Sequence, residues 1–208
     1  MKTIFVKLCA LVGIVMMASC TGEKFHVTGT LGNAKDSVLY FENMSLNGPV
    51  TVDSVKLDET GAFDFSGEKC DNPEFYRLRI AGQIINIAID STETVSVKGS
   101  YPMMATNYTV SDSYENEKIR ELALKQIDLQ SRCQQLANDN TMGVDSTVVA
   151  IRRLVDSYKD DISRNYIYKE PMRAYAYFAL FQYITVNNQS SLIFNPRENI
   201  DDAKVFVA

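Results

Sequence analysis

Few side chains of this sequence have the types and spacing that catalysis or metal binding requires. His26 is the single histidine, which excludes a metal site made of several histidines. It falls one residue into the first expected strand, where we interpret it as an exposed or edge side chain. Asp53 and Ser54 put a carboxylate beside a hydroxyl. Neighbours along a strand point to opposite faces, however, and no second base accompanies them.

The acidic clusters do not indicate a cation site either. Asp58, Glu59 and Asp64 surround one turn, but they lack the spaced oxygen ligands of a calcium loop, so we expect a solvated turn. The pairs Asp160-Asp161 and Asp201-Asp202 are also expected to be solvated. No glycine-rich phosphate loop occurs in the sequence. The sequence therefore predicts no catalytic residue, no metal and no cofactor.

Thiol chemistry is the remaining possibility, because the chain contains four cysteines. No two of them form a Cys-x-x-Cys motif, which is the spacing used in thiol–disulfide exchange. An oxidising compartment would permit a disulfide between Cys70 and Cys133, but their separation in sequence leaves open whether they are close enough. Cys133 lies on an apolar helical stripe, which favours a small buried side chain instead.

The first twenty residues have the pattern of an export signal. Lys2 and Lys7 are basic, Leu8 to Met17 is an apolar run, and two small residues precede Cys20. An apolar run of this length is too short to span a bilayer. The pattern resembles a bacterial lipoprotein signal, in which the cysteine is lipidated and becomes the first residue of the mature chain.

That resemblance implies a signal peptide in residues 1–19, lipidation of Cys20 and a short polar tether in residues 20–24. The membrane is then a partner through lipidated Cys20. The alternatives are an ordinary secretory signal cut nearby, or a short membrane anchor that is kept. The net charge of −5 argues against nucleic acid as a partner, because an acidic chain gains nothing from polyphosphate.

Residues 25–112 are expected to form a β-rich domain. Apolar and polar side chains alternate in short runs that are separated by turn signals such as Asn47-Gly48. The phase of this alternation changes across Asp53-Ser54, which indicates a bulge. Seven or eight short strands without an intervening helical pattern predict an antiparallel β-sandwich or an open barrel, and argue against a parallel sheet.

Residues 113–196 are expected to follow as a connector of three helices, which gives an α+β fold. The first helix has Ser113 as its N-cap and continues to about Ala137. The second begins near Asp145 or Ser146 and carries an apolar stripe as far as Tyr166, with charged side chains facing away. We expect these two helices to form an antiparallel pair.

The third expected helix is apolar on nearly all sides. Pro171 lies in its first turn, and the helix continues through Ala174–Val186. A helix without a polar face must be covered over most of its surface. It lies between the first two helices and the sheet, or it meets another protein through the aromatic side chains Tyr175, Phe178 and Phe181. Residues 197–208 are expected to be the irregular tail of a truncated chain.

Several motifs, taken in this order, are similar to those of a known domain. They are Phe25-x-Val27-x-Gly29-Thr30-Leu31, Val52-Asp53-Ser54-Val55, Gly61-x-Phe63-x-Phe65-x-Gly67, Pro73-x-Phe75-Tyr76-Arg77-Leu78, Asn107-Tyr108-Thr109-Val110 and Ile119-Arg120-Glu121-Leu122. Together they resemble the domain of unknown function at the N-terminus of exported, thioredoxin-like lipoproteins of Gram-negative bacteria. In that family a connector leads into a thioredoxin domain with a Cys-x-x-Cys. This chain has no such motif, so no active-site residue is carried over.

Two functions follow as hypotheses. The first is a lipid-anchored, non-catalytic binding or scaffold module on the periplasmic or surface face of a Gram-negative membrane. Its partner would be a thioredoxin-like or other envelope protein. The alternative is the N-terminal part of a thiol-disulfide oxidoreductase whose thioredoxin domain is missing or separately encoded. In neither case do we expect this chain to be an enzyme by itself.

Overall fold

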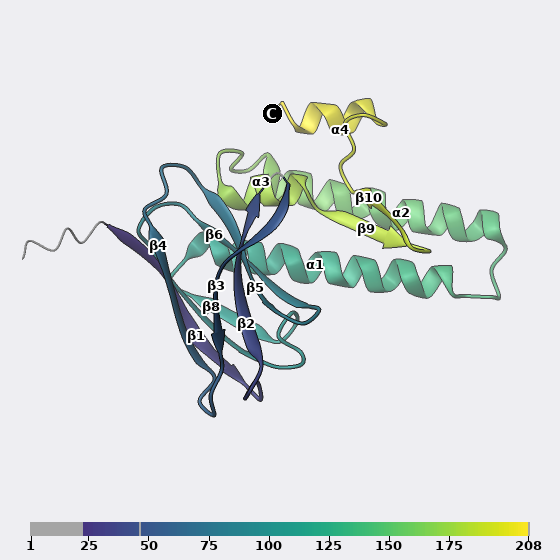
Figure 1. Ribbon diagram of the computed structural model, residues 1–208. Coiled ribbons are helices and arrows are strands. Elements are labelled where there is room, and N and C mark those ends of the chain that lie inside the picture. The colour runs from purple at the N-terminus through teal and green to yellow at the C-terminus, as the bar shows by residue number, and fades with distance from the viewer. Residues whose placement is uncertain (1–22, 46, 208) are drawn as a thin grey trace, which may run out of the picture.

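The computed structural model describes residues 23–45 and 47–207 (Figure 1). The expected signal peptide, residues 1–19, and the expected lipidation site Cys20 lie outside the described residues. Eight strands come first and form two sheets, and the helices follow, so the expected α+β class is confirmed. Among the described residues, no helix combines the length and the apolar character needed to cross a bilayer.

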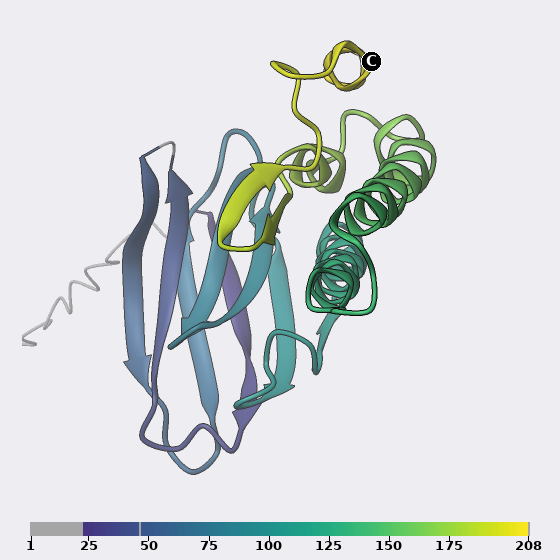
Figure 2. The same cartoon turned by 90° about the vertical axis from the view of Figure 1, so that its right-hand side faces the viewer.

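The strands form a sandwich of two four-stranded sheets rather than an open barrel (Figure 2). In spatial order the first sheet consists of β4 (Ala62–Glu68), β1 (Lys24–Gly32), β7 (Thr94–Ser100) and β8 (Tyr108–Ser111). The second sheet consists of β3 (Gly48–Lys56), β2 (Val38–Ser45), β5 (Glu74–Ile80) and β6 (Gln83–Ile89). Alternate side chains of each strand point into the space between the sheets.

The sandwich core is built from the apolar positions that alternate along the strands. Phe25, Val27 and Leu31 of β1 are almost completely buried. Phe41 of β2 stacks on Phe65 of β4, with ring centroids 5.2 Å apart, and this contact joins the two sheets. Because each such side chain contributes about 1.5–3 kcal/mol when it leaves water, this core stabilises the pairing of the sheets.

Two details of the sheets depart from the sequence prediction. β1 pairs with β7 in parallel, with Val27 opposite Val95, although every other neighbouring pair of strands is antiparallel. Alternation along one strand carries no information about which strand becomes its neighbour. The bulge also lies one residue earlier than predicted. Phe41 is opposite Asp53 and Glu42 is opposite Thr51, so Val52 is the extra residue.

Two long helices form an arm that extends away from the sandwich (Figure 1). α1 (Tyr114–Ala137) begins after Ser113, whose hydroxyl accepts a hydrogen bond from the backbone N–H of Asn116, as predicted for an N-cap. α2 (Val144–Ile162) returns beside α1 and continues into the π-helical turn η1 (Ser163–Ile167). A second apolar cluster lies among these helices and the segments that follow them.

The third helix is shorter than predicted. α3 (Ala174–Leu180) is followed by a hairpin of β9 (Tyr183–Val186) and β10 (Gln189–Leu192), so the prediction of a helix to Val186 is wrong. Asn187 and Asn188 have φ angles of 49° and 63°, the left-handed values that a two-residue hairpin turn requires and that asparagine tolerates. The β-branched residues before this turn also favour a strand.

The predicted irregular tail contains a short helix. α4 (Ile200–Val205) is capped by Asn199, whose side chain accepts the backbone N–H of Asp201. Asp202 was expected to be solvated, but it is buried. It pairs with Lys159 of α2 at 2.7 Å and accepts the backbone N–H of Asn195. The ion pair fastens α4 to the helical arm.

Candidate functional site

Exposed aromatic side chains gather at α3 and at the segments that follow it. We call Tyr177, Phe181 and Phe206 the aromatic surface. The rings of Tyr177 and Phe181 lie 4.7 Å apart between centroids, and Phe206 meets Phe181 edge-on at 5.9 Å. Tyr177 is 52% exposed and Phe181 is 47% exposed, whereas Phe206 is partly buried. The two exposed rings therefore present apolar area to solvent.

Helical spacing explains why these rings point outward. Tyr177 and Phe181 are four residues apart and so lie on the same side of the α3 turn. The opposite side of α3 is buried in the second apolar cluster and consists of Ala174, Tyr175, Ala176 and Ala179. The expected helix is thus covered in part, with Phe178 and Leu180 partly buried and the rings of Tyr177 and Phe181 about half-exposed.

A side chain of the sandwich packs against the aromatic surface. Phe75 lies on the outward side of β5, and its ring stacks on Tyr177 at 5.6 Å and lies 6.5 Å from Phe178. A row of rings thus runs from the sheet across α3 to the residue after α4. Because each of these rings packs against another ring, the side chains lose little conformational freedom when a partner binds. This favours the binding of an apolar partner.

The three residues predicted to contact a partner lie in different environments. Tyr175 is 1% exposed, and its hydroxyl donates a hydrogen bond to Glu170 at 2.5 Å. Burial raises the pKa of Tyr175, and the hydrogen bond to Glu170 raises it further. Phe178 is partly buried against Phe75. Of the three, only Phe181 presents its ring to solvent.

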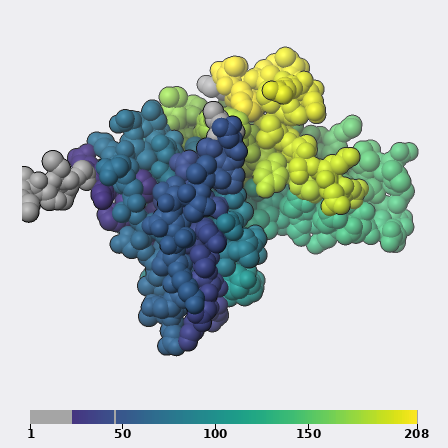
Figure 3. Space-filling view, viewed as in Figure 1, coloured from purple at the N-terminus to yellow at the C-terminus, as the bar shows by residue number. Residues whose placement is uncertain are grey.

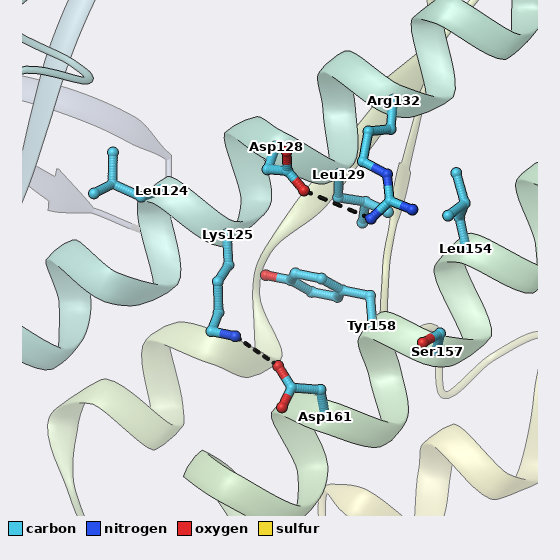
Figure 4. A pocket seen from close by; sticks show the side chains of 9 residues that line it. All are labelled: Leu124, Lys125, Asp128, Leu129, Arg132, Leu154, Ser157, Tyr158 and Asp161. Carbon is cyan, nitrogen blue, oxygen red and sulfur yellow. Dashed lines mark hydrogen bonds and ion pairs between the residues drawn. The ribbon is translucent and has the colours of Figure 1, made fainter.

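A groove between α1 and α2, with a volume of about 530 Å³, is a second candidate site (Figure 4). Lys125 bridges the two helices through Asp161 at 2.8 Å, and Asp128 pairs with Arg132 along α1 at 3.7 Å. The hydrogen bond from Lys125 lowers the pKa of Asp161. A carboxylate with a lowered pKa is a weak base, so Asp161 is not poised to abstract a proton.

A buried carboxylate on the outward side of the second sheet was not found by sequence reasoning. Glu42 is 4% exposed and accepts hydrogen bonds from Arg77 Nε at 2.5 Å and from Arg79 Nη2 at 2.8 Å. The guanidinium of Arg79 also lies 4.4 Å from the ring centre of Tyr40. Hydrogen bonds from Arg79 and Arg77 hold the pKa of Glu42 below its usual value, although burial opposes this shift. The sequence did contain a signal for such a site, because Arg77 and Arg79 alternate along one strand and so lie on the same face.

The polar residues singled out in the sequence have mostly local partners. His26 Nδ1 lies 3.2 Å from Asp64 Oδ1, and both side chains are well exposed, although β1 is a central strand and not an edge. Asp53 accepts the backbone N–H of Ser54, and Asp58 accepts those of Thr60 and Gly61, as in a solvated turn. Within residues 23–45 and 47–207, no three His, Cys, Asp or Glu side chains are grouped to hold a metal ion.

The two described cysteines are free thiols. Cys70 belongs to the sandwich core, where its sulfur lies 3.9 Å from the hydroxyl of Tyr76. Cys133 is fully buried in the separate cluster of the helical arm, as its position on an apolar stripe favoured. Burial raises the pKa of both thiols, which disfavours the reactive thiolate.

The comparison with known families supports one part of the resemblance found in the sequence, the similarity to a domain of unknown function. The family model described as a domain of unknown function (DUF4369) matches residues 25–119. This segment is similar to that domain of unknown function. It spans both sheets of the sandwich and ends in the second turn of α1, whose first turn is bound to β6. No curated protein matches the chain.

Proposed function

We propose that this protein is a lipid-anchored, non-catalytic binding or scaffold module of the Gram-negative cell envelope. The aromatic surface is the site at which it meets a protein partner. The observation that carries the proposal is the exposure of Tyr177 and Phe181, each about half-accessible and each supported by further rings. The lipoprotein-like sequence pattern that ends at Cys20 supports the anchor.

Aromatic side chains that are half-exposed on a fixed support are typical of binding surfaces. They supply large contact area at low conformational cost, and tyrosine adds a hydroxyl for hydrogen bonding. Partner association would cover Tyr177 and Phe181 and displace water from both rings. Truncation of one such residue at the centre of an interface typically costs about 2 kcal/mol or more of binding free energy.

The test compares two double variants of the lipidated protein. Tyr177→Ser with Phe181→Ser removes the outward rings of the aromatic surface. The matched control, Val148→Ser with Val149→Ser, removes two side chains of α2 that are similarly exposed, at 51% and 45%. Proteins recovered with each variant from native membranes are then identified by mass spectrometry.

We expect a partner that is recovered with the wild type and the control to be lost with the aromatic variant. Recovery of the same partners with all three proteins would overturn the role of the aromatic surface. The anchor is tested separately with Cys20→Ser, which should move the protein from the membrane fraction to the soluble fraction. Retention of that variant in the membrane fraction would overturn the lipid anchor.

The second candidate function is the N-terminal part of a thiol-disulfide oxidoreductase, with its thioredoxin domain missing or separately encoded. The match of residues 25–119 to DUF4369 favours it, because the sequence resembles lipoproteins in which this domain precedes a thioredoxin domain. Recovery of a thioredoxin-like protein through the aromatic surface would support this candidate. Recovery of other envelope proteins would support the scaffold role instead.

A further inference from the structure

We propose that one end of the β-sandwich rests on the lipid bilayer, with the loop before α3 and the helix α4 in contact with the membrane surface. This inference rests on the lipid anchor of the proposed function and adds the orientation of the molecule on the membrane. We call this end, at which β1 begins, the anchor end. The opposite end of the sandwich then points away from the bilayer.

The direction of the strands defines the anchor end. β1 starts there with Lys24, which lies opposite Glu68 at the end of β4. β7 runs parallel to β1, so its first residues lie at the anchor end and its last residue, Ser100, lies at the far end opposite Gly32. β8 returns antiparallel to β7, so α1 also begins at the anchor end.

The tether leaves little freedom to turn the anchor end away from the membrane. Lys24, the first residue of β1, is four positions after Cys20. A fully extended chain spans about 3.3–3.6 Å per residue, so four residues reach at most about 14 Å. Because Cys20 carries the lipid in the proposed anchor, the start of β1 must stay within that distance of the bilayer surface.

Met172, one of the most exposed apolar side chains of the helical part, lies toward this same end. Met172 is 94% exposed, in the loop between η1 and α3. This loop is fixed beside the start of α1, because Tyr114 donates to Glu170 and Arg173 pairs with Glu115. α4 lies beyond the upper end of the sandwich, above the helical segments, in both ribbon views, and it forms the top of the space-filling view (Figures 1, 2 and 3).

α4 and the residues after it add further apolar area. Ile200, the first residue of α4, is 74% exposed, and Val207, which follows α4, is 85% exposed. Interfacial segments insert apolar side chains of this size at the boundary between head groups and acyl chains. The proposed bilayer contact would remove Met172, Ile200 and Val207 from water.

Charge contributes little to the proposed contact. Three cations toward this end are paired with a carboxylate of the chain: Lys69 with Glu23, Arg173 with Glu115, and Lys204 with Asp201. Paired cations gain little from anionic head groups, and the proposed contact rests on the insertion of apolar side chains. We therefore expect it to form on electrically neutral lipid and to resist added salt.

A thiol-specific fluorescent label can measure this orientation on the full lipidated protein. Met172→Cys introduces a labelling site at the anchor end. Met103→Cys is the matched control, since it is 60% exposed in the connection that follows Ser100 at the far end. Cys70 and Cys133 are buried and their pKa values are raised, so the introduced thiol reacts selectively. Each labelled protein is reconstituted into phosphatidylcholine vesicles with a nitroxide quencher on the acyl chain.

We expect the lipid nitroxide to quench the label at position 172 severalfold more than the label at position 103, with no loss of the difference at high salt. Equal, weak quenching at both positions in vesicle-bound protein would overturn the proposed orientation and leave the anchor intact. Shielding of position 172 in native membranes without quenching by lipid would assign it to a protein contact and overturn the proposal. Failure of the lipidated protein to bind vesicles would overturn the anchor itself, and the orientation with it.

Discussion

At the residue scale, two buried tyrosines differ in whether their hydroxyl has a partner. Tyr158 donates to the side chain of Gln182 at 2.5 Å, whereas the buried hydroxyl of Tyr108 has no hydrogen-bond partner among the described residues. An unpaired buried hydroxyl costs free energy, so Tyr108→Phe should leave stability unchanged or raise it by up to about 1 kcal/mol. Tyr158→Phe should lower stability by about 1 kcal/mol.

Urea unfolding of both variants checks this pair. Each change deletes one oxygen from a side chain of the same shape, so a difference between them reports the hydrogen bond and not the packing. If Tyr108→Phe lost as much stability as Tyr158→Phe, a bound water must satisfy the Tyr108 hydroxyl.

Glu42 makes stability depend on pH. Its folded-state pKa lies below the ordinary value of 4.5, chiefly because Arg79 and Arg77 donate to it. A lowered pKa stabilises the fold above the unfolded-state value, and this contribution disappears as the pH falls through the folded-state value. Glu42→Gln should cost about 3 kcal/mol at pH 7, because two partly exposed arginines lose the charge of a buried acceptor.

The same variant should show a weaker loss of stability between neutral and acidic pH than the wild type. Unfolding measured at pH 7 and at pH values below 4.5 tests this. Glu59→Gln is the control, since Glu59 pairs with Lys35 in an exposed position and should change little at either pH. An unchanged acid dependence in Glu42→Gln would contradict the assignment.

At the scale of elements, the pairing of β1 with β7 depends on a glycine. A Cβ at Gly29 would lie 1.8 Å from the carbonyl oxygen of Val97 and 2.9 Å from the ring of Phe63. Gly29→Ala must therefore push apart two paired strands and should lower the free energy of unfolding by about 3 kcal/mol. Gly82→Ala is the control, because no heavy atom lies within 4 Å of its added Cβ. Thermal unfolding that is equal in both variants would show that the strands adjust.

The sequence correctly predicted elements that are marked by a pattern of neighbouring residues. Ser113 was identified as a cap because a hydroxyl before a helical stripe satisfies the first backbone N–H groups. The hairpin after α3 was missed because its aromatic and β-branched residues also fit a buried helix. The informative signal was the pair Asn187-Asn188, because two consecutive left-handed residues can form a hairpin turn. The sequence prediction did not use this signal.

The candidate site was predictable only in part, because exposure depends on contacts between distant segments. Sequence reasoning selected the aromatic run of α3, but it could not separate Tyr175 from Phe181. Tyr175 is buried by Glu170 and by the rings of Tyr114 and Tyr166, which pack against it only in the folded chain. The burial of Asp202 likewise depends on Lys159, which lies 43 residues away in sequence.

At the scale of the whole molecule, two apolar clusters meet where α1 and α3 contact the sandwich. The sandwich core and the cluster of the helical arm share no residue, but Ala88 of β6 belongs to the cluster of the arm. Asn116 of α1 is fully buried at this junction. Its amide donates to Ala88 O at 2.7 Å, and its carbonyl accepts the Ala88 N–H at 2.8 Å. This side chain therefore takes the place of a further strand along the edge of β6.

Asn116→Ala should weaken this coupling between the two parts of the molecule. It leaves a buried N–H and a buried C=O of β6 without partners, and each unsatisfied group costs about 1–3 kcal/mol, so we expect a loss of about 3 kcal/mol. Because the lost bonds join the two clusters, the helical arm should unfold before the sandwich, and two denaturant transitions should replace one. Gln135→Ala, on the exposed side of α1, should keep a single transition. One unshifted transition in Asn116→Ala would mean that Phe75 and the rings above it hold the sandwich and the arm together without Asn116.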